Sequence, residues 1–298
     1  MKLLIDTDIG DDIDDSLAIA WAIRLNLEIV GITTVYRDAP ERAKIVKRLL
    51  SLSSREEIPV KYGESVPLTK SGFLIGHFNY TAEYDGELEG GGAKFIAECA
   101  EKYGEELTVL ALGEQTNLAK AYLEYPEKMK KVGRVVMMGG AFFAHCDEWN
   151  IAGDPTAARI VMEKGERLEY VNWDMTRYAG IGEANTRRIL SANENEQSLR
   201  GYVVNLVKQW TKRNRYFPIL HDPLALYYCL DDSAFETMRV TAKVLDEGDF
   251  SGLILNTSDF QGHQNRRTLH GAGNSVRVCK KADYQFLVEK FMKDVFGE

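Results

Sequence analysis

The sequence predicts an α/β fold with a mainly parallel, open sheet of βαβ units, followed by a late antiparallel pair of strands and extra helices. Short apolar runs of strand length alternate along the chain with segments of helical periodicity. Such alternation favours right-handed βαβ units and a parallel sheet. No linker, low-complexity tract or internal repeat interrupts the pattern. We therefore expect residues 1–298 to form a single domain.

The predicted elements follow one another in a regular order. Six apolar runs are interpreted as strands of the parallel sheet, at residues 3–5, 28–35, 58–62, 108–112, 134–138 and 169–173. Helical patterns lie at residues 16–23, 39–51, 156–164, 194–214, 221–229 and 284–296. In the helix at 39–51 we expect the basic residues to face outward. The antiparallel pair is predicted at residues 241–245 and 251–255. Residues 71–92 form the loosest region, either a lid or a surface loop.

Composition narrows the class of protein. A net charge of −8 and the lack of a Lys/Arg block argue against nucleic-acid binding. No apolar stretch approaches the roughly 20 residues of a membrane-spanning helix. No secretory signal precedes the first strand, and the four cysteines form no CxxC pair. We therefore expect reduced thiols and a cytoplasmic protein.

The densest chemical feature is an acidic segment directly after the first strand. Residues 6–15 hold six aspartates, and carboxylates packed this closely repel one another unless a cation lies among them. Hard oxygen ligands favour Ca²⁺ or Mg²⁺ over zinc or copper. The segment follows a strand at the edge where open α/β sheets place their sites. The alternative is a solvated acidic turn that caps the next helix.

Other polar segments also follow predicted strands or open helices, at residues 34–38, 112–117, 138–140, 148–155 and 221–223. Taken singly, each is explained by a turn, a helix cap or a proline at a helix start. Taken together and in this order, they resemble the inosine–uridine nucleoside hydrolases, a family of Ca²⁺-dependent N-ribosyl hydrolases. The matching motifs are Asp6-x-Asp8-x-Gly10 with Asp14-Asp15, Thr34-Val35-Tyr36, Gly113-x-x-Thr116-Asn117, Met138-Gly139-Gly140, Glu148-Trp149-Asn150, Asp154-Pro155 and His221-Asp222-Pro223.

The chain departs from the family pattern in several places. Two extra residues lie between Gly10 and Asp14. Asp38 stands where the family has an asparagine that contacts the ribose, after Arg37 in place of a glycine. The segment between Gly140 and Glu148 is short. These departures concern the identity of the substrate, including which nucleobase is preferred, more than the reaction.

The resemblance implies a role for each matched residue. It implies a Ca²⁺ site formed by Asp8, Asp15, the carbonyl of Leu112 and Asp222. Asp8 is then also the base that activates the attacking water. Asp14, Asp38 and Asn150 are expected to bind the ribose, and Glu148 its 5′ end. His221 is the candidate acid for the leaving base, because the ordinary pKa of histidine lies near neutrality.

The implied partners are a small ribonucleoside and further copies of the chain, as a dimer or a tetramer, with no nucleic acid or membrane. Trp210, Tyr216 and Phe217 are candidates for stacking on a nucleobase, although helix and core packing is the more common role of such residues. One alternative function is a nucleoside- or ribosyl-binding protein without turnover. A Mg²⁺-dependent phosphatase of the haloacid dehalogenase type is a weaker alternative, since the extra acids exceed what a phosphate-completed Mg²⁺ site needs.

Overall fold

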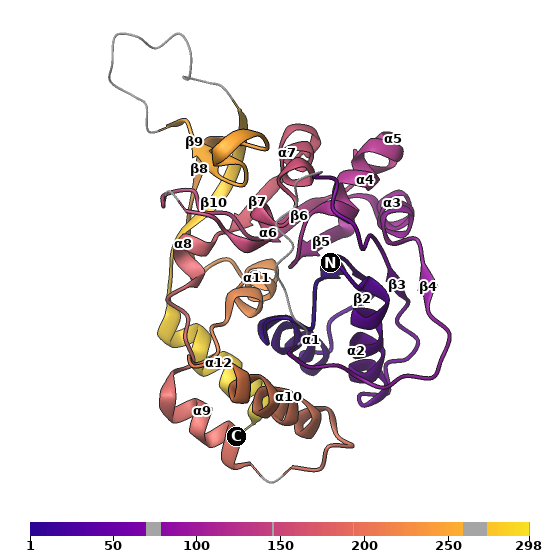
Figure 1. Ribbon diagram of the computed structural model, residues 1–298, viewed down its shortest axis with the longest axis vertical. Helices are drawn as coiled ribbons and strands as arrows, with labels where there is room; N and C mark the ends of the chain where they lie inside the picture. The colour runs from indigo at the N-terminus through magenta and orange to yellow at the C-terminus, as the bar shows by residue number, and fades with distance from the viewer. Residues whose placement is uncertain (70–78, 145, 193, 259–272, 298) are drawn as a thin grey trace.

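The computed structural model describes residues 1–69, 79–144, 146–192, 194–258 and 273–297. The strands among them are β1 (Lys2–Thr7), β2 (Ile29–Thr34), β3 (Val60–Tyr62), β4 (Glu89–Gly90), β5 (Leu107–Ala111), β6 (Arg134–Met138), β7 (Leu168–Val171), β8 (Phe235–Val244), β9 (Ile254–Asn256) and β10 (Asn274–Ala282). In the described part they form one sheet in the order β4-β3-β2-β1-β5-β6-β7-β10-β8-β9 (Figure 1).

The strand order reverses direction at β1. From β1 the chain builds outward through β2, β3 and β4, and it then returns to place β5 on the other side of β1. Both neighbours pair with β1 in parallel, so Asp6 lies beside Thr33 on β2 and beside Ala111 on β5. Open α/β sheets bind ligands at the carboxyl ends of the two strands that flank such a reversal. The segments after β1 and β5 therefore meet at this point.

Helices cover both faces of the sheet. They are α1 (Asp14–Arg24), α2 (Ala39–Ser51), α3 (Gly92–Tyr103), α4 (Thr116–Glu124), α5 (Pro126–Met129), α6 (Trp149–Ala152), α7 (Pro155–Lys164), α8 (Trp173–Thr176), α9 (Gly182–Ser191), α10 (Leu199–Arg213), α11 (His221–Leu230) and α12 (Tyr284–Phe296). Leu3 and Ile5 pack in one core with α1, α2, α10, α11 and α12, whereas Leu4 packs in a second core with α3, α4 and α7. This division follows from the alternation of side chains along a strand.

Most predicted elements are confirmed, and α2, β6 and α12 have the predicted bounds. The sixth run ends earlier than predicted, because Trp173 begins α8 instead of closing β7. Helix α10 begins at Leu199, since the Ser198 hydroxyl accepts a hydrogen bond from Gly201 N at 3.0 Å and caps the helix there. The predicted late pair exists as β8 and β9, which are antiparallel.

The prediction omits β10, which lies between β7 and β8, parallel to β7 and antiparallel to β8. In β10 only Val276, Val278 and Cys279 are buried, so its apolar signal in the sequence is weak. The four cysteines are free thiols, as predicted. No helix in the described ranges is long and apolar enough to span a bilayer.

Candidate active site

A cavity of about 520 Å³ opens beside the carboxyl ends of β1, β5 and β6. Asp8 follows β1, Leu112 follows β5 and Met138 ends β6, and all three line the cavity. The starts of α1 and α11 contribute Asp14, Asp15, His221 and Asp222 to the wall. The cavity thus occupies the strand-order reversal, where the fold predicts a ligand site.

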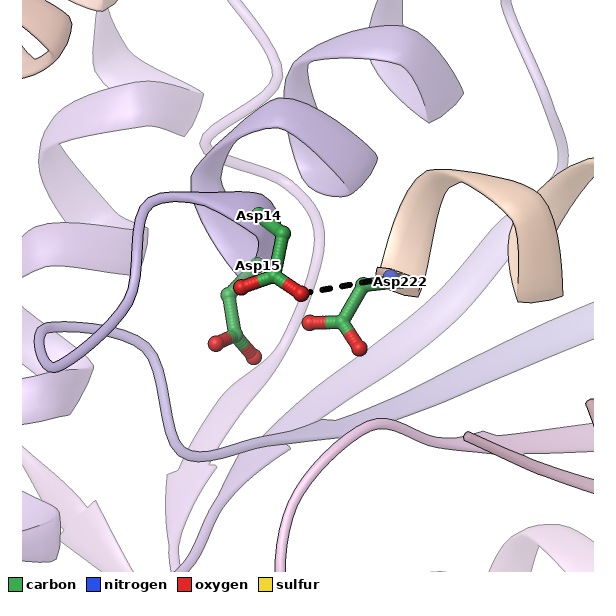
Figure 2. A group of neighbouring side chains, drawn as sticks. All are labelled: Asp14, Asp15 and Asp222. Carbon is green, nitrogen blue, oxygen red and sulfur yellow. Dashed lines mark hydrogen bonds between the residues drawn. The ribbon is translucent and has the colours of Figure 1, made fainter. Parts of the chain in front are cut away.

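Three buried aspartates converge at the floor of this cavity. Asp14 and Asp15 leave the start of α1 and Asp222 leaves the start of α11, and Figure 2 shows their carboxylates gathered between the two helix ends. One oxygen from each lies within 4.8 Å of the others. Asp14 Oδ2 also accepts a hydrogen bond from Asp222 N at 3.4 Å, which joins the two helix starts. This group holds two of the predicted metal ligands, Asp15 and Asp222, and adds Asp14.

Burial and mutual repulsion make this group electrostatically costly by itself. Burial raises the pKa of the Asp14 and Asp222 carboxyls well above the ordinary value, and the neighbouring aspartates raise both further. Burial also raises the pKa of Asp15 to about 6, although the Thr7 hydroxyl donates to its Oδ1 and opposes the shift. A divalent cation reverses this balance, because it neutralises the charges that repel one another. The donors are all oxygens, which suits a hard cation.

Asp8 lies in the same cavity wall, next to this group. Burial, followed by the charge of Asp15, raises the pKa of its carboxyl well above the ordinary value. Gly113 permits this position, since a Cβ there would come within 2.8 Å of Asp8 Cβ. The glycine of the Gly-x-x-Thr-Asn motif is therefore explained by the close approach of Asp8.

Arg42 supports the acidic loop through hydrogen bonds to its backbone carbonyls, and the sequence did not predict this role. The expectation that basic residues of α2 face outward is wrong here, because the Arg42 side chain is completely buried. Its guanidinium donates to the carbonyls of Asp8, Ile9 and Tyr36, and to Asp11 Oδ2 at 3.1 Å. A guanidinium has enough donors for this set, so its burial is compensated.

Asn150 and Glu148 also line the cavity. The Asn150 amide donates to the Leu112 carbonyl at 2.5 Å and to the Met138 carbonyl at 3.1 Å, so it ties β5 to β6. The Glu148 carboxylate accepts from the backbone N–H groups of Gly140, Asn150 and Ile151 at 2.7–3.2 Å. Glu148 thus caps α6, the short helix that carries Asn150.

His221 is the first residue of α11 and lines the cavity. Its Nδ1 lies 2.7 Å from the hydroxyl oxygen of Thr176, which follows β7 on α8. Burial lowers the pKa of the imidazole to about 4, so the ring is uncharged at neutral pH. The expectation of an ordinary pKa near neutrality does not hold at this position.

Asp38 lies apart from the other predicted site residues. It is exposed and caps α2, accepting from Glu41 N at 3.4 Å, and it does not belong to the described cavity lining. The structure therefore brings together Asp8, Asp14, Asp15, Leu112, Glu148, Asn150, His221 and Asp222, without Asp38.

Aromatic side chains form another part of the wall. Trp210 and Tyr216 both line the cavity, in an edge-to-face pair with ring centroids 5.1 Å apart. Phe217 does not belong to the described lining and is half-exposed. Trp149 and Trp173 also line the cavity, and no sequence periodicity singles them out.

Comparison with known proteins identifies the family of the chain. The chain matches the model of the inosine-uridine preferring nucleoside hydrolases over residues 3–289, and it belongs to that family. Uridine nucleosidase 1 of Arabidopsis thaliana is 30% identical over 277 residues, which cover 85% of this chain and 81% of that protein. The pyrimidine-specific ribonucleoside hydrolase RihA of Salmonella typhimurium is 26% identical over 270 residues, covering 84% of this chain and 86% of RihA.

Solved structures share the fold. The plant nucleoside hydrolase PpNRh1 aligns with a TM-score of 0.82 at 24% identity, covering 99% of this chain and 98% of that one. The purine-preferring ribonucleoside hydrolase from Gardnerella vaginalis aligns with a TM-score of 0.81 at 23% identity, with the same coverage. The predicted family and fold class are thereby confirmed, and the chain is a hydrolase that acts on N-glycosyl bonds of ribonucleosides.

Proposed function

We propose that the chain is a Ca²⁺-dependent nucleoside hydrolase that splits ribonucleosides into ribose and free base, with Asp8 as the base that activates water. The observation that carries the proposal is the gathering of Asp14, Asp15 and Asp222 within one buried group, in a cavity that Asp8 also lines.

The residues present fit a calcium ion. Asp15, Asp222 and Asp8 would supply carboxylate oxygens and Leu112 a carbonyl oxygen, and Asp14 adds a further carboxylate beside them. Calcium accepts six to eight such oxygens in flexible geometry, whereas the smaller Mg²⁺ demands a near-ideal octahedron. When bound, the ion supplies positive charge that lowers the pKa of a water molecule and orients it.

Asp8 is suited to take the proton from that water. A general base works best when its pKa lies near the operating pH, and burial moves the Asp8 carboxyl in that direction. The surrounding carboxylates also stabilise the positive charge that develops on the ribosyl group as the glycosidic bond breaks. The reaction adds the water oxygen to C1′, and the bonding pair departs with the base.

Asn150 and Asp14 are assigned to the ribose hydroxyls. Two backbone carbonyls hold the amide nitrogen of Asn150, which leaves its amide oxygen to accept from a hydroxyl. Three backbone donors already engage Glu148, so its contribution to the 5′ end is mainly to fix the loop. Asp38 is left as a helix cap.

His221 is assigned to the leaving base as a neutral hydrogen-bond donor. When the Thr176 hydroxyl donates to Nδ1, the ring proton is on Nε2. An uncharged imidazole can then stabilise the departing base by a hydrogen bond, although it is a weaker acid than an imidazolium.

We further propose that the enzyme acts in the cytoplasm as a homo-oligomer, a dimer or a tetramer, as the family resemblance implies. Light scattering after size-exclusion chromatography measures the assembly directly. A monomer at micromolar concentration would contradict this part of the proposal.

The activity is tested by incubating the full chain with inosine, uridine, cytidine and adenosine, with Ca²⁺ or with a chelator, and measuring released ribose. We expect ribose only with the metal. Asp222→Ala should abolish release, because it removes a proposed oxygen ligand, whereas the matched control Asp38→Ala, outside the described cavity lining, should retain it. Nucleoside binding without any release of ribose would instead support the binding-protein alternative.

A further inference from the structure

The acidic segment contains two extra residues to which the proposed chemistry gives no role. They follow Gly10, in a loop that is held by two neighbouring residues of the segment between β3 and β4. Asn79 N donates to Gly10 O at 2.8 Å, and the Asn79 side-chain amide donates to Asp11 O. The Tyr80 hydroxyl donates to Asp12 O at 2.6 Å. Three successive carbonyls of the loop therefore accept hydrogen bonds from residues 79 and 80.

The Tyr80 hydroxyl also joins this loop to the first turn of α1. It accepts a hydrogen bond from the Ser16 hydroxyl at 3.0 Å while it donates to Asp12 O. The phenol is 2% exposed and belongs to the same buried core as Ile13 and Leu17. Because water has almost no access to this position, loss of the phenol hydroxyl would leave both of its partners without a hydrogen bond. Tyr80 thus bridges residues 12 and 16 across the start of α1.

The start of α1 has no side-chain cap of its own. Its N-cap residue is Ile13, which forms no capping hydrogen bond, whereas Asp154 caps α7 and Ser198 caps α10. A helix start without a cap is less stable than a capped one. Figure 2 shows Asp14 and Asp15 on this first turn of α1. The placement of these two carboxylates therefore depends on contacts from outside the helix, and the bridge to the phenol supplies them.

On the basis of the proposed function, we propose that Tyr80 is a positioning residue of the cation site, whose hydroxyl fixes the start of α1 so that Asp14 and Asp15 are preorganised for the ion. Tyr80 does not belong to the described cavity lining, so it acts through the helix rather than by contact with the nucleoside. Groups that hold metal ligands in place commonly contribute about ten- to a hundredfold to metal affinity. The extra residues of the loop then serve to bring the Asp12 carbonyl to the phenol.

The first test removes only the hydroxyl, by Tyr80→Phe. We expect the Kd for Ca²⁺, measured by calorimetric titration, to rise about tenfold. The value of kcat for ribose release, measured at saturating Ca²⁺, should change less than this Kd. The matched control is Tyr202→Phe, because Tyr202 is also buried and its hydroxyl has no hydrogen-bond partner among the described residues. This control should preserve the wild-type Kd. Equal Kd values for wild type and Tyr80→Phe, or equal losses in the two phenylalanine variants, overturn the inference.

A double-mutant cycle tests whether the effect depends on the bridge between Tyr80 and Ser16. Ser16→Ala removes the other side of the 3.0 Å hydrogen bond and should also raise the Kd for Ca²⁺. The variant that combines both changes should differ from Tyr80→Phe alone by less than about twofold, because the two groups act through one contact. Losses that multiply in the combined variant overturn the inference.

Hydrogen exchange of the metal-free chain tests the bridge without the ion. We expect Tyr80→Phe to speed exchange about tenfold in the peptide that covers the first two turns of α1, and Tyr202→Phe to leave that peptide at the wild-type rate. An unchanged rate in Tyr80→Phe overturns the inference. If the wild-type chain binds no Ca²⁺ although exchange responds as expected, the proposed function is contradicted and the role of Tyr80 in fixing α1 stands.

Discussion

Asp154, from the Asp-Pro pair that opens α7, provides the most quantitative test of how the site is built. Its side chain is fully buried and accepts five hydrogen bonds. Oδ1 accepts from Thr69 N, Thr69 Oγ1 and Ala157 N at 2.8–3.2 Å. Oδ2 accepts from Leu68 N at 2.8 Å and Thr116 Oγ1 at 2.7 Å. One carboxylate thus joins the segment after β3, the start of α4 and the start of α7.

The size of the effect follows from the donors left without an acceptor. Asp154→Ala abandons all five, and at about 1 kcal/mol for each buried orphaned donor, less some relaxation, we expect a loss of roughly 4 kcal/mol in the free energy of unfolding. Asp154→Asn retains the three bonds to its amide oxygen and turns an NH₂ group toward the other two donors. We expect it to lose roughly half as much.

The assay is urea unfolding at saturating Ca²⁺, followed by circular dichroism, with thermal unfolding in parallel. For a chain of this size each 1 kcal/mol corresponds to roughly 2–4 °C, so Asp154→Ala should lower the melting temperature by roughly 10 °C. Asp38→Ala is the matched control, since it removes a single cap bond at an exposed carboxyl. The reasoning is refuted when both alanine variants destabilise the protein equally.

Three further predictions concern the cavity. Arg42→Met leaves three backbone carbonyls and the Asp11 carboxylate without the guanidinium, so the free energy of unfolding in chemical denaturation should fall by roughly 3 kcal/mol. Arg42→Lys should not restore that stability. Wild-type stability in either variant contradicts this prediction. Gly113→Ala places a Cβ 2.8 Å from that of Asp8, so kcat should fall more than Ca²⁺ affinity in parallel kinetic and calorimetric assays, and unchanged kcat opposes it. The pKa of Asp15 in the folded chain is raised to about 6, so the metal-free fold binds more protons than the unfolded chain and loses stability as the pH rises through that value. Added Ca²⁺ should therefore raise the melting temperature more at about pH 8 than at about pH 5. An equal rise at both pH values contradicts this prediction.

Much of the fold was predictable because its units are local in sequence. The apolar run of residues 134–138 and the periodicity of residues 39–51 give β6 and α2 with the predicted bounds. The acidic segment follows β1 directly, so its place at the carboxyl edge of the sheet follows from the βαβ pattern alone. Asp222 is different, because only the packing of α11 beside α1 brings it to Asp14 and Asp15, and its inclusion depended on the family resemblance.

The unpredicted features depend on tertiary contacts. Arg42 has the helical spacing of the buried face of α2, three and four residues before Ile45 and Val46, but a charged side chain is normally exposed. Only the carbonyls of the acidic loop make its burial favourable. Asp38 occupies a ribose-binding position of the family pattern, yet here it caps α2. Glu148 lies in the predicted site, but the engagement of its carboxylate by three backbone donors depends on the shape of the loop. Strand β10 is anchored by pairing with β7 and β8 rather than by its own apolar pattern.

The central claim is that Asp8 performs the chemistry beside a cation held mainly by its neighbours. The most direct measurement is kcat for ribose release by wild type and Asp8→Asn, with the Kd for Ca²⁺ determined calorimetrically on the same samples. We expect Asp8→Asn to lower kcat by at least about 100-fold and to change the Kd for Ca²⁺ by less than about tenfold, because the amide retains an oxygen donor. Ribose release by Asp8→Asn at the wild-type rate would contradict it.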